Sequence, residues 1–132
     1  MDFDGHAVQT EARELSLPGL AIVDMSTLLR LNRLESIDLS GNQISNIYPL
    51  ENAECRFNLR YVDLSHNEIS DATPVSHLIN CEHLDLSYNS ISSELPFMLL
   101  YSLRYLDLSG NPLTEEQVDT LRNTLVDCEI IF

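Results

Sequence analysis

The sequence LRYVDLSHNEIS, residues 59–70, is one of four closely related segments in this chain. The other three are LESIDLSGNQIS at 34–45, CEHLDLSYNSIS at 81–92 and LRYLDLSGNPLT at 103–114. Each segment contains D-L-S after an apolar residue, and each continues to an asparagine two residues after the serine. Four copies of one segment indicate a single structural unit that is used repeatedly.

The repeat extends beyond these four copies in both directions. With any apolar residue allowed at the L and I positions of L-x-x-L-x-L-x-x-N-x-I, copies begin at Ala12, Leu34, Leu59, Cys81, Leu103 and Leu125. The steps are 22, 25, 22, 22 and 22 residues, and the first and last copies match the pattern incompletely. Because terminal repeats of an array face solvent on one side, we expect one capped domain over 12–132, preceded by an N-terminal cap segment at 1–11.

Each copy is expected to form a short strand with one buried face. Residues in a strand alternate between its two sides, so the apolar pair Ile37 and Leu39 and its counterparts face one way. Strands that return every 22 residues in the same sense pair in parallel, about 4.8 Å apart. At the bend after each strand, an asparagine amide can pair with backbone groups that turn inward. We expect this structural role for Asn42, Asn67, Asn89 and Asn111.

The segments that return from one strand to the next are expected to be short. A proline recurs in them at Pro49, Pro74 and Pro96, which favours 3₁₀ or extended turns over long helices. Three extra residues within 51–58 are expected to bulge outward or add a helical turn. In the last return, Thr114 and Gln117 have the spacing of a capping box, which predicts a helix over about 115–126 that caps the open end. The residues CEIIF at 128–132 are expected to form a final edge strand.

The four segments resemble the leucine-rich repeat family, and the resemblance covers residues 12–132. The tails ISNIYPL at 44–50 and ISDATPV at 69–75 are similar to the short 22-residue class of SDS22-like and internalin-like proteins. This resemblance implies an α/β solenoid: a right-handed coil with a curved parallel sheet on its concave side. It also implies protein binding on that concave side, without catalysis.

Polar residues between the core positions are the candidate binding residues. Asp38, Asp63, Asp85, Asp107 and Glu129 occupy equivalent slots and are expected to form an acidic column on the concave face. One slot earlier, Tyr61, His83 and Tyr105 should form a row beside it, with His66 and Tyr88 next to the bends. Aromatic rings beside carboxylates suit arginine or lysine side chains, through cation–π contact and ion pairing. The alternative is that the aspartates only record the amplification of one repeat.

The overall charge favours a basic protein partner. The chain has 21 acidic residues against seven arginines and no lysine, for a net charge of −14. This balance disfavours nucleic acid and anionic membranes. We therefore expect a non-catalytic interaction module, either a monomer or one subunit of a hetero-complex. Two alternatives are an inhibitor or immunity-type protein that blocks a basic enzyme, and a structural subunit of a larger assembly. Such a subunit would pack by its convex face, which includes Met98 and Tyr101, or by its helical cap.

No cofactor, metal site or catalytic site is expected, because the sequence has no phosphate-binding loop and no G-x-S-x-G motif. Residues 1–11 carry neither a basic start nor an apolar run, so we expect no signal peptide and a cytoplasmic location. The three cysteines have unrelated spacings and are expected to be reduced. Cys81 and Cys128 occupy core positions, whereas Cys55 lies in the expected bulge and should be exposed.

Overall fold

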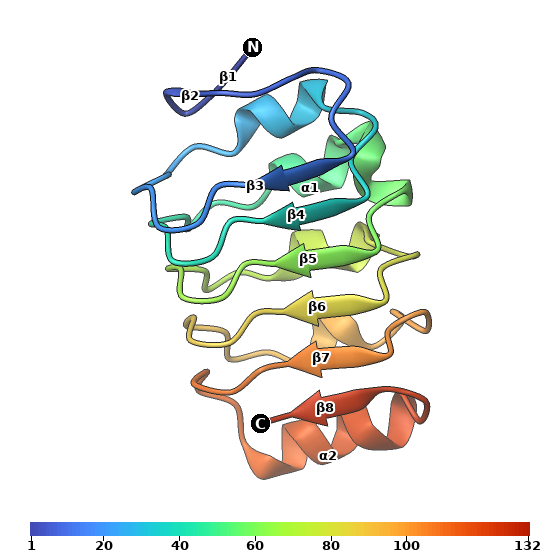
Figure 1. Ribbon diagram of the computed structural model, residues 1–132. Helices are drawn as coiled ribbons and strands as arrows, with labels where there is room; N and C mark the ends of the chain where they lie inside the picture. Colours follow the sequence, from blue (N-terminus) through green and yellow to red (C-terminus); the bar gives the residue numbers. More distant parts are fainter.

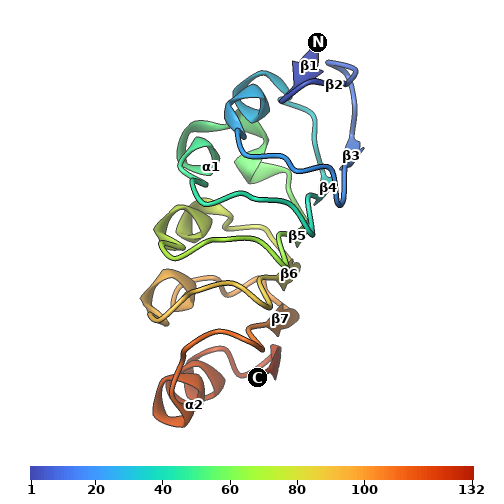
Figure 2. The same ribbon diagram turned by 90° about the vertical axis from the view of Figure 1, so that its left-hand side faces the viewer.

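The computed structural model describes all residues, 1–132, and is an α/β solenoid. Six parallel strands form one sheet in the sequence order β3-β4-β5-β6-β7-β8 (Figure 1). Their bounds are Glu14–Ser16, Ser36–Asp38, Tyr61–Asp63, His83–Asp85, Tyr105–Asp107 and Glu129–Ile131. The strands line one side of the coil and the helical returns line the other (Figure 2). The order confirms that each repeat adds one strand beside the preceding one.

The chain starts with a small antiparallel hairpin that the repeat pattern does not contain. Its strands are β1 (Asp2–Phe3) and β2 (His6–Ala7). The Phe3 side chain is fully buried against the first repeat. The Asp4 carboxylate accepts hydrogen bonds from the backbone N–H groups of Val23 and Asp24, at 2.7 and 3.2 Å. These contacts attach the hairpin to the open end of the array.

The returns are single helical turns, as predicted. They comprise η1 (Ser26–Arg30), α1 (Pro49–Asn52), η2 (Glu54–Phe57), η3 (Thr73–His77) and η4 (Leu95–Phe97), of which all but α1 are 3₁₀ helices. The recurring proline stands in the first turn of α1, η3 and η4, where its missing N–H is not needed for an intrahelical hydrogen bond. No helix in the structure is long and apolar enough to cross a bilayer.

The extra residues of the 25-residue repeat form a helical turn, η2. The prediction that Cys55, within this turn, would be exposed was wrong. Cys55 is fully buried, not exposed. The added turn directs this side chain toward the core, while its neighbour Phe57 stays exposed. Burial raises the pKa of the Cys55 thiol to about 11.

The last return is a true α-helix, α2, over Glu115–Thr124. It begins with the predicted capping box: the Thr114 hydroxyl accepts a hydrogen bond from the Gln117 N–H, and the Gln117 side chain accepts one from the Thr114 N–H. Val118 and Leu121 are buried on its inner face. The helix ends two residues before the predicted boundary.

The register of the last strand was predicted wrongly. β8 pairs Glu129 with Tyr105 and Ile131 with Asp107, so Glu129 does not continue the column of aspartates. The cause is the helix: an α-helix advances only about 1.5 Å per residue, and the α2 return needs two more residues than a 3₁₀ turn to reach the sheet. For the same reason Cys128 misses the core position and is partly exposed.

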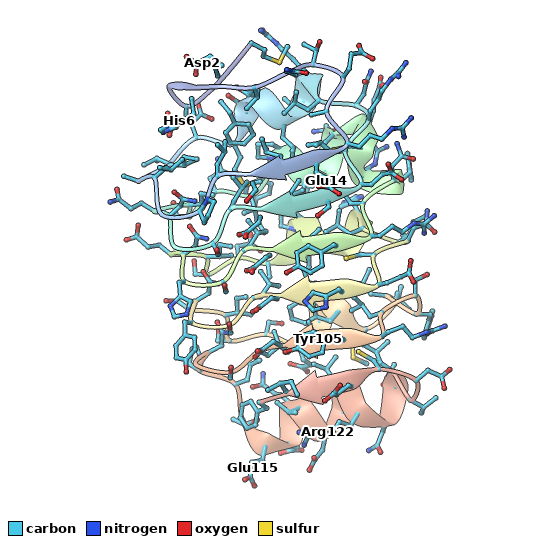
Figure 3. The ribbon with its side chains drawn as sticks, viewed as in Figure 1. Asp2, His6, Glu14, Tyr105, Glu115 and Arg122 are labelled. Carbon is cyan, nitrogen blue, oxygen red and sulfur yellow. The ribbon has the colours of Figure 1, made fainter.

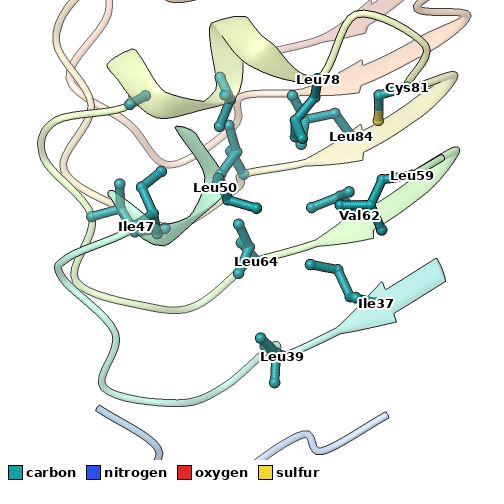
Figure 4. Packing of buried hydrophobic residues seen from close by; sticks show 14 of the residues in the cluster. Ile37, Leu39, Ile47, Leu50, Leu59, Val62, Leu64, Leu78, Cys81 and Leu84 are labelled. Carbon is teal, nitrogen blue, oxygen red and sulfur yellow. The ribbon is translucent and has the colours of Figure 1, made fainter. Parts of the chain in front are cut away.

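The core is one continuous column of apolar side chains between sheet and returns. It contains 35 buried residues, and equivalent positions of successive repeats stack on one another (Figure 4). Leu59, Val62 and Leu64 contribute from one repeat, and Cys81 and Leu84 contribute from the next. Phe97 is fully buried in the fourth repeat, as its alignment with Leu50 predicted. Each repeat therefore depends on its neighbours for burial.

The asparagines bridge adjacent repeats at the bends. Asn67 accepts a hydrogen bond from the Ile44 N–H at 3.0 Å and donates to the carbonyls of Leu39 and Leu64 at 3.0 and 3.1 Å. Asn42, Asn89 and Asn111 make the equivalent bonds in their repeats. One amide thus satisfies backbone groups of two successive turns and links them.

Candidate functional site

The sheet face carries two parallel columns of side chains. The acidic column comprises Asp38, Asp63, Asp85 and Asp107, which are register partners on adjacent strands. The second column, which we call the ring column, comprises Glu14, Ser36, Tyr61, His83, Tyr105 and Glu129. Figure 3 shows Glu14 and Tyr105 on this face, Glu14 on the first strand of the sheet, β3, and Tyr105 on β7, next to the last strand. The predicted aspartates and aromatic residues are therefore brought together.

Each aspartate of the acidic column holds the serine two residues later. Asp63 Oδ1 accepts hydrogen bonds from the Ser65 N–H at 3.0 Å and from the Ser65 hydroxyl at 2.6 Å. The same pair of bonds occurs in the other three repeats. Asp63 Oδ2 has no partner in the protein. In Asp38, Asp63 and Asp85 one carboxylate oxygen is therefore fixed by the fold and the other has no protein partner, whereas Asp107 Oδ2 accepts a hydrogen bond from the Tyr105 hydroxyl at 3.4 Å.

No basic side chain neutralises the acidic column. The residues at the N-terminal ends of the strands alternate in charge from one strand to the next, and we call them the edge ladder: Arg13, Glu35, Arg60, Glu82 and Arg104. Within this edge ladder, Arg13 pairs with Glu35 at 3.1 Å and Arg60 pairs with Glu82 at 3.9 Å. The remaining salt bridges of the protein, Arg33–Glu11 and Arg122–Asp119, also lie away from the column. The aspartates thus face one another without counter-charges.

The three aromatic residues of the ring column stack face to face. The ring centroids of Tyr61 and His83 lie 4.5 Å apart, with an angle of 18° between planes, and those of His83 and Tyr105 lie 4.4 Å apart, at 10°. The sequence-based hypothesis placed a cation against these faces. The structure leaves little room for this at His83, because both of its faces are covered. Only the outward faces of Tyr61 and Tyr105 remain.

The acidic column also affects the tyrosines. Burial and then the charges of Asp63, Asp38 and Asp85 raise the pKa of the Tyr61 hydroxyl. Burial, followed mainly by the charges of Asp107 and Asp85, raises the pKa of Tyr105, whose hydroxyl also donates to Asp107 Oδ2 at 3.4 Å. Both phenols therefore remain protonated donors beside the carboxylates at neutral pH.

His66 and Tyr88 form a separate pair at the bend, outside the two columns. Their ring centroids are 4.5 Å apart and the planes differ by 15°. Both residues have a left-handed backbone, with φ of 54° and 55°, at the position that glycine occupies in the flanking repeats. The Tyr88 ring lies directly over Gly110, where a Cβ atom would come within 2.5 Å of it. This pair places two further aromatic rings at the bends that follow β5 and β6.

Cysteines and possible metal ligands contribute no second site to this face. No group of three or more His, Cys, Asp or Glu side chains converges in a geometry suited to a metal ion. All three cysteines are free thiols. Burial raises the pKa of Cys81 to about 12 and that of Cys128 to about 11. Neither thiol has the lowered pKa that nucleophilic cysteines require.

The comparisons with known proteins agree with this architecture. Two family models, both described as leucine rich repeat, match residues 57–113 and 33–53. This chain belongs to the leucine-rich repeat family. Leucine-rich repeat proteins generally serve as protein-interaction modules, and stacked repeats offer an extended concave surface for that purpose. No curated protein sequence matches the chain.

Solved leucine-rich repeat structures superimpose on most of the chain. Internalin C2 of Listeria monocytogenes aligns over 89% of it, with 31% sequence identity and a TM-score of 0.76. A second Listeria internalin (inlF) and a leucine-rich repeat protein of Leptospira interrogans each align over 84%, with 25% identity and TM-scores of 0.73. The chain spans 49% of internalin C2 and 31% and 29% of the other two.

Sequence reasoning missed two features of this leucine-rich repeat face. Glu14 belongs to the ring column, one strand before Ser36, although the Ala12 repeat was recognised as the first copy. The alternating edge ladder was also missed, yet its signal is visible in the sequence: the second residue of each repeat is Arg13, Glu35, Arg60, Glu82 or Arg104. Aligning all columns of the repeat, and not only the apolar ones, would have revealed both.

Proposed function

We propose that this leucine-rich repeat protein is a non-catalytic interaction module that binds a basic segment of another protein on its sheet face. The observation that carries the proposal is the uncompensated acidic column. Its four aspartates project from neighbouring strands, and no arginine lies against them. A partner with spaced basic side chains would supply the missing counter-charges.

The energetics favour such a ligand over an empty face. Unit charges about 4 Å apart repel by about 1 kcal/mol in water, and more when solvent is excluded. Strand spacing of about 4.8 Å places neighbouring carboxylates of the column in this range. Basic groups that bind between them would relieve this repulsion and form charge-assisted hydrogen bonds to the free Oδ2 atoms.

The proposal is tested with hexa-arginine and hexa-lysine peptides labelled with a fluorophore, because no natural partner is identified. The triple variant Asp63→Asn, Asp85→Asn, Asp107→Asn removes three charges from the face and keeps the Oδ1 acceptors. The matched control removes three charges from α2, through Glu115→Gln, Glu116→Gln and Asp119→Asn. Fluorescence anisotropy at several salt concentrations measures affinity.

We expect the face variant to lose at least tenfold in affinity at 0.15 M salt, and the α2 variant to lose less than threefold. The salt dependence of log Kd should also be shallower for the face variant, since fewer ion pairs form. Equal losses in both variants would contradict the proposal, because they would show that only the net charge attracts the peptides.

The inhibitor alternative uses the same face and differs only in the partner. If the basic segment lines the cleft of an enzyme, adding this protein would inhibit that enzyme. The face variant, which binds the segment more weakly, would leave the enzyme active. A cytoplasmic setting remains part of this proposal; it is consistent with three free thiols in the structure.

An exposed apolar column supports the second candidate function, a structural subunit. Phe57, Ile79 and Tyr101 occupy the same position in three successive repeats and are 48, 50 and 63% exposed. Met98, the other residue predicted for this role, is partly buried against the core and contributes less. Replacing Ile79 and Tyr101 with glutamate would shift the protein to a smaller complex on size-exclusion chromatography of native lysate if this column holds an assembly together. An unchanged elution volume would exclude it.

A further inference from the structure

We propose that the ring column has one open position, over Ser36, and that this position receives the guanidinium group of a partner arginine, stacked flat on Tyr61. The proposal rests on the proposed function and specifies where on the sheet face the partner is anchored. The ligand chemistry is a planar cation that continues the aromatic stack by one more layer.

The open position follows from the register of the strands. Tyr61, His83 and Tyr105 stack at the spacing of the strands, with centroids 4.5 and 4.4 Å apart. The next register partner of Tyr61 is Ser36, whose small side chain cannot fill a layer of the stack. Glu14 follows on the next strand, so Tyr61 and Glu14 stand two strand spacings apart, about 9.6 Å. A planar group of aromatic thickness fits between them.

The exposure of the rings agrees with an open end at Tyr61. Tyr61 is 38% exposed, whereas His83 and Tyr105 are half-buried. At the other end of the stack, the register partner of Tyr105 is Glu129, a longer side chain that stands where the next layer would lie. The stack is thus bounded on the β8 side and unoccupied on the β4 side.

The charges around this position select a cation. Asp38 and Asp63 lie on the same face as Ser36 and Tyr61, two residues further along each strand. Each has an Oδ2 atom without a protein partner. Glu14, the far wall, makes no salt bridge, while neighbouring Arg13 is already paired with Glu35. Unpaired carboxylates therefore line one side of the open position. The arginines at the start of the strands, Arg13, Arg33 and Arg60, are each paired with a glutamate.

Geometry favours arginine over lysine at this position. A guanidinium group is planar, stacks on aromatic faces and presents several N–H donors in its plane, so it can contact Tyr61 and hydrogen-bond to flanking carboxylates at once. A lysine ammonium is a compact, strongly hydrated point charge without a stacking face. The neutral isostere citrulline keeps the plane but loses the charge.

The test uses N-acetyl-arginine methylamide as the probe, with the lysine and citrulline counterparts, titrated at low salt and followed by NMR. We expect arginine to shift the signals of Ser36, Asp38 and the Tyr61 ring. Lysine should bind at least threefold more weakly, and citrulline at least tenfold more weakly. The decisive variant is Ser36→Tyr, which fills the open layer with the residue that the neighbouring repeat already carries. It should weaken arginine binding at least tenfold.

The control variant is Ser16→Tyr, which adds the same side chain in line with the acidic column, on β3, without occupying the layer next to Tyr61. It should leave arginine affinity within threefold. A second variant, Tyr61→Leu, removes the stacking face without changing charge and should abolish the preference for arginine over lysine. Amide spectra report whether each variant keeps the fold.

Two results would overturn the proposal: equal binding of arginine and lysine, or undiminished arginine binding by Ser36→Tyr. If hexa-arginine still required the acidic column in either case, the proposed function would stand and only the anchor position would be wrong. If the triple aspartate variant also bound hexa-arginine normally, the proposed function would fail independently.

Discussion

Asp85 holds Ser87 through two hydrogen bonds to one carboxylate oxygen, 3.0 Å from the backbone N–H and 2.6 Å from the hydroxyl. The serine is buried, whereas the aspartate is only partly covered. This pairing gives the D-L-S motif a structural meaning at the end of each strand. It also leaves the second carboxylate oxygen free, so one residue can serve both the fold and a ligand.

The two roles of Asp85 separate in a pair of variants. Asp85→Asn keeps an Oδ1 acceptor for Ser87 and removes the charge, so we expect its free energy of unfolding to stay within about 0.5 kcal/mol of the wild type. Asp85→Ala removes the acceptor from a buried serine and should cost about 1–2 kcal/mol. Urea unfolding followed by circular dichroism measures both. Equal destabilisation would mean that the charge itself, and not the acceptor, holds the bend.

Asn67 should be among the most sensitive polar residues. Its amide satisfies the Ile44 N–H and the carbonyls of Leu39 and Leu64, all within the core. Asn67→Ala would leave these groups unpaired, and we expect a loss of about 3 kcal/mol in the free energy of unfolding.

Asn111→Ala is the matched control for this prediction. Asn111 makes the equivalent hydrogen bonds but is less buried and lies at the last bend before α2. Because solvent can replace part of its bonding, its loss should be smaller, about 1–2 kcal/mol. A larger loss at Asn111 would show that the α2 cap, and not the middle of the array, limits stability.

The repeated elements could be predicted from the sequence because each is determined locally. The apolar pairs and the bend asparagines of the four full repeats, and the capping box at Thr114, follow from spacing and from residue chemistry. All of these are confirmed. The four aspartates were placed correctly for the same reason, since strands in identical register align identical slots.

The errors arose where the repeat length changes. The longer α2 return moved Glu129 and Cys128 out of the predicted slots, and the added turn η2 buried Cys55. The direction of the rings was also beyond prediction: sequence places Tyr61, His83 and Tyr105 in one row but does not fix whether the rings lie flat on the sheet or stack on each other. Their mutual contact decides that question.

Gly110 and Gly41 occupy the same bend in different repeats and differ only in what lies beside them. Both have a positive φ, 72° and 67°. A Cβ atom at Gly110 would come within 2.5 Å of the Tyr88 ring, whereas at Gly41 the nearest atom is 3.7 Å away. We expect Gly41→Ala to cost about 1 kcal/mol for the left-handed backbone alone, and Gly110→Ala to cost about 1–2 kcal/mol more.

The double variant Gly110→Ala, Tyr88→Ala isolates the steric part in thermal or urea unfolding. If the ring contact causes the difference, Gly110→Ala should cost no more than Gly41→Ala once the Tyr88 ring is absent. A persistent difference would assign the cost to the backbone at this bend.

The cysteines should react in a fixed order with a thiol reagent. All three pKa values lie above the ordinary value of 9.0, at about 11 for Cys55 and Cys128 and about 12 for Cys81. Since the thiolate is the reactive form, labelling at pH 8 should be slow, and raising the pH should accelerate it. Cys128, the partly exposed one, should react first, as mass spectrometry of digested protein would reveal. Early labelling of Cys55 or Cys81 would indicate that the repeats open readily.

The stability of the protein should rise with salt, because the chain carries a net charge of −14 and repels itself in the folded state. Between 0.02 and 0.5 M sodium chloride the Debye length falls from well above the strand spacing to about that distance, which screens neighbouring carboxylates of the acidic column. We expect the free energy of unfolding in urea to increase by about 1–2 kcal/mol. The face variant with asparagine at 63, 85 and 107 should be more stable than the wild type at low salt and should gain less from added salt.

The α2 variant, with the same reduction in net charge, identifies the origin of this effect. Its three carboxylates are not stacked on adjacent strands, and Glu115 and Glu116 lie in the first turn of the helix, where negative charge is favourable. It should therefore gain no stability at low salt, or lose some. If both triple variants became equally more stable, the repulsion would belong to the net charge of the molecule as a whole. If only the face variant became more stable, the fold would be holding the aspartates of the sheet together against their mutual repulsion. This is the state expected of a site that binds a cationic ligand.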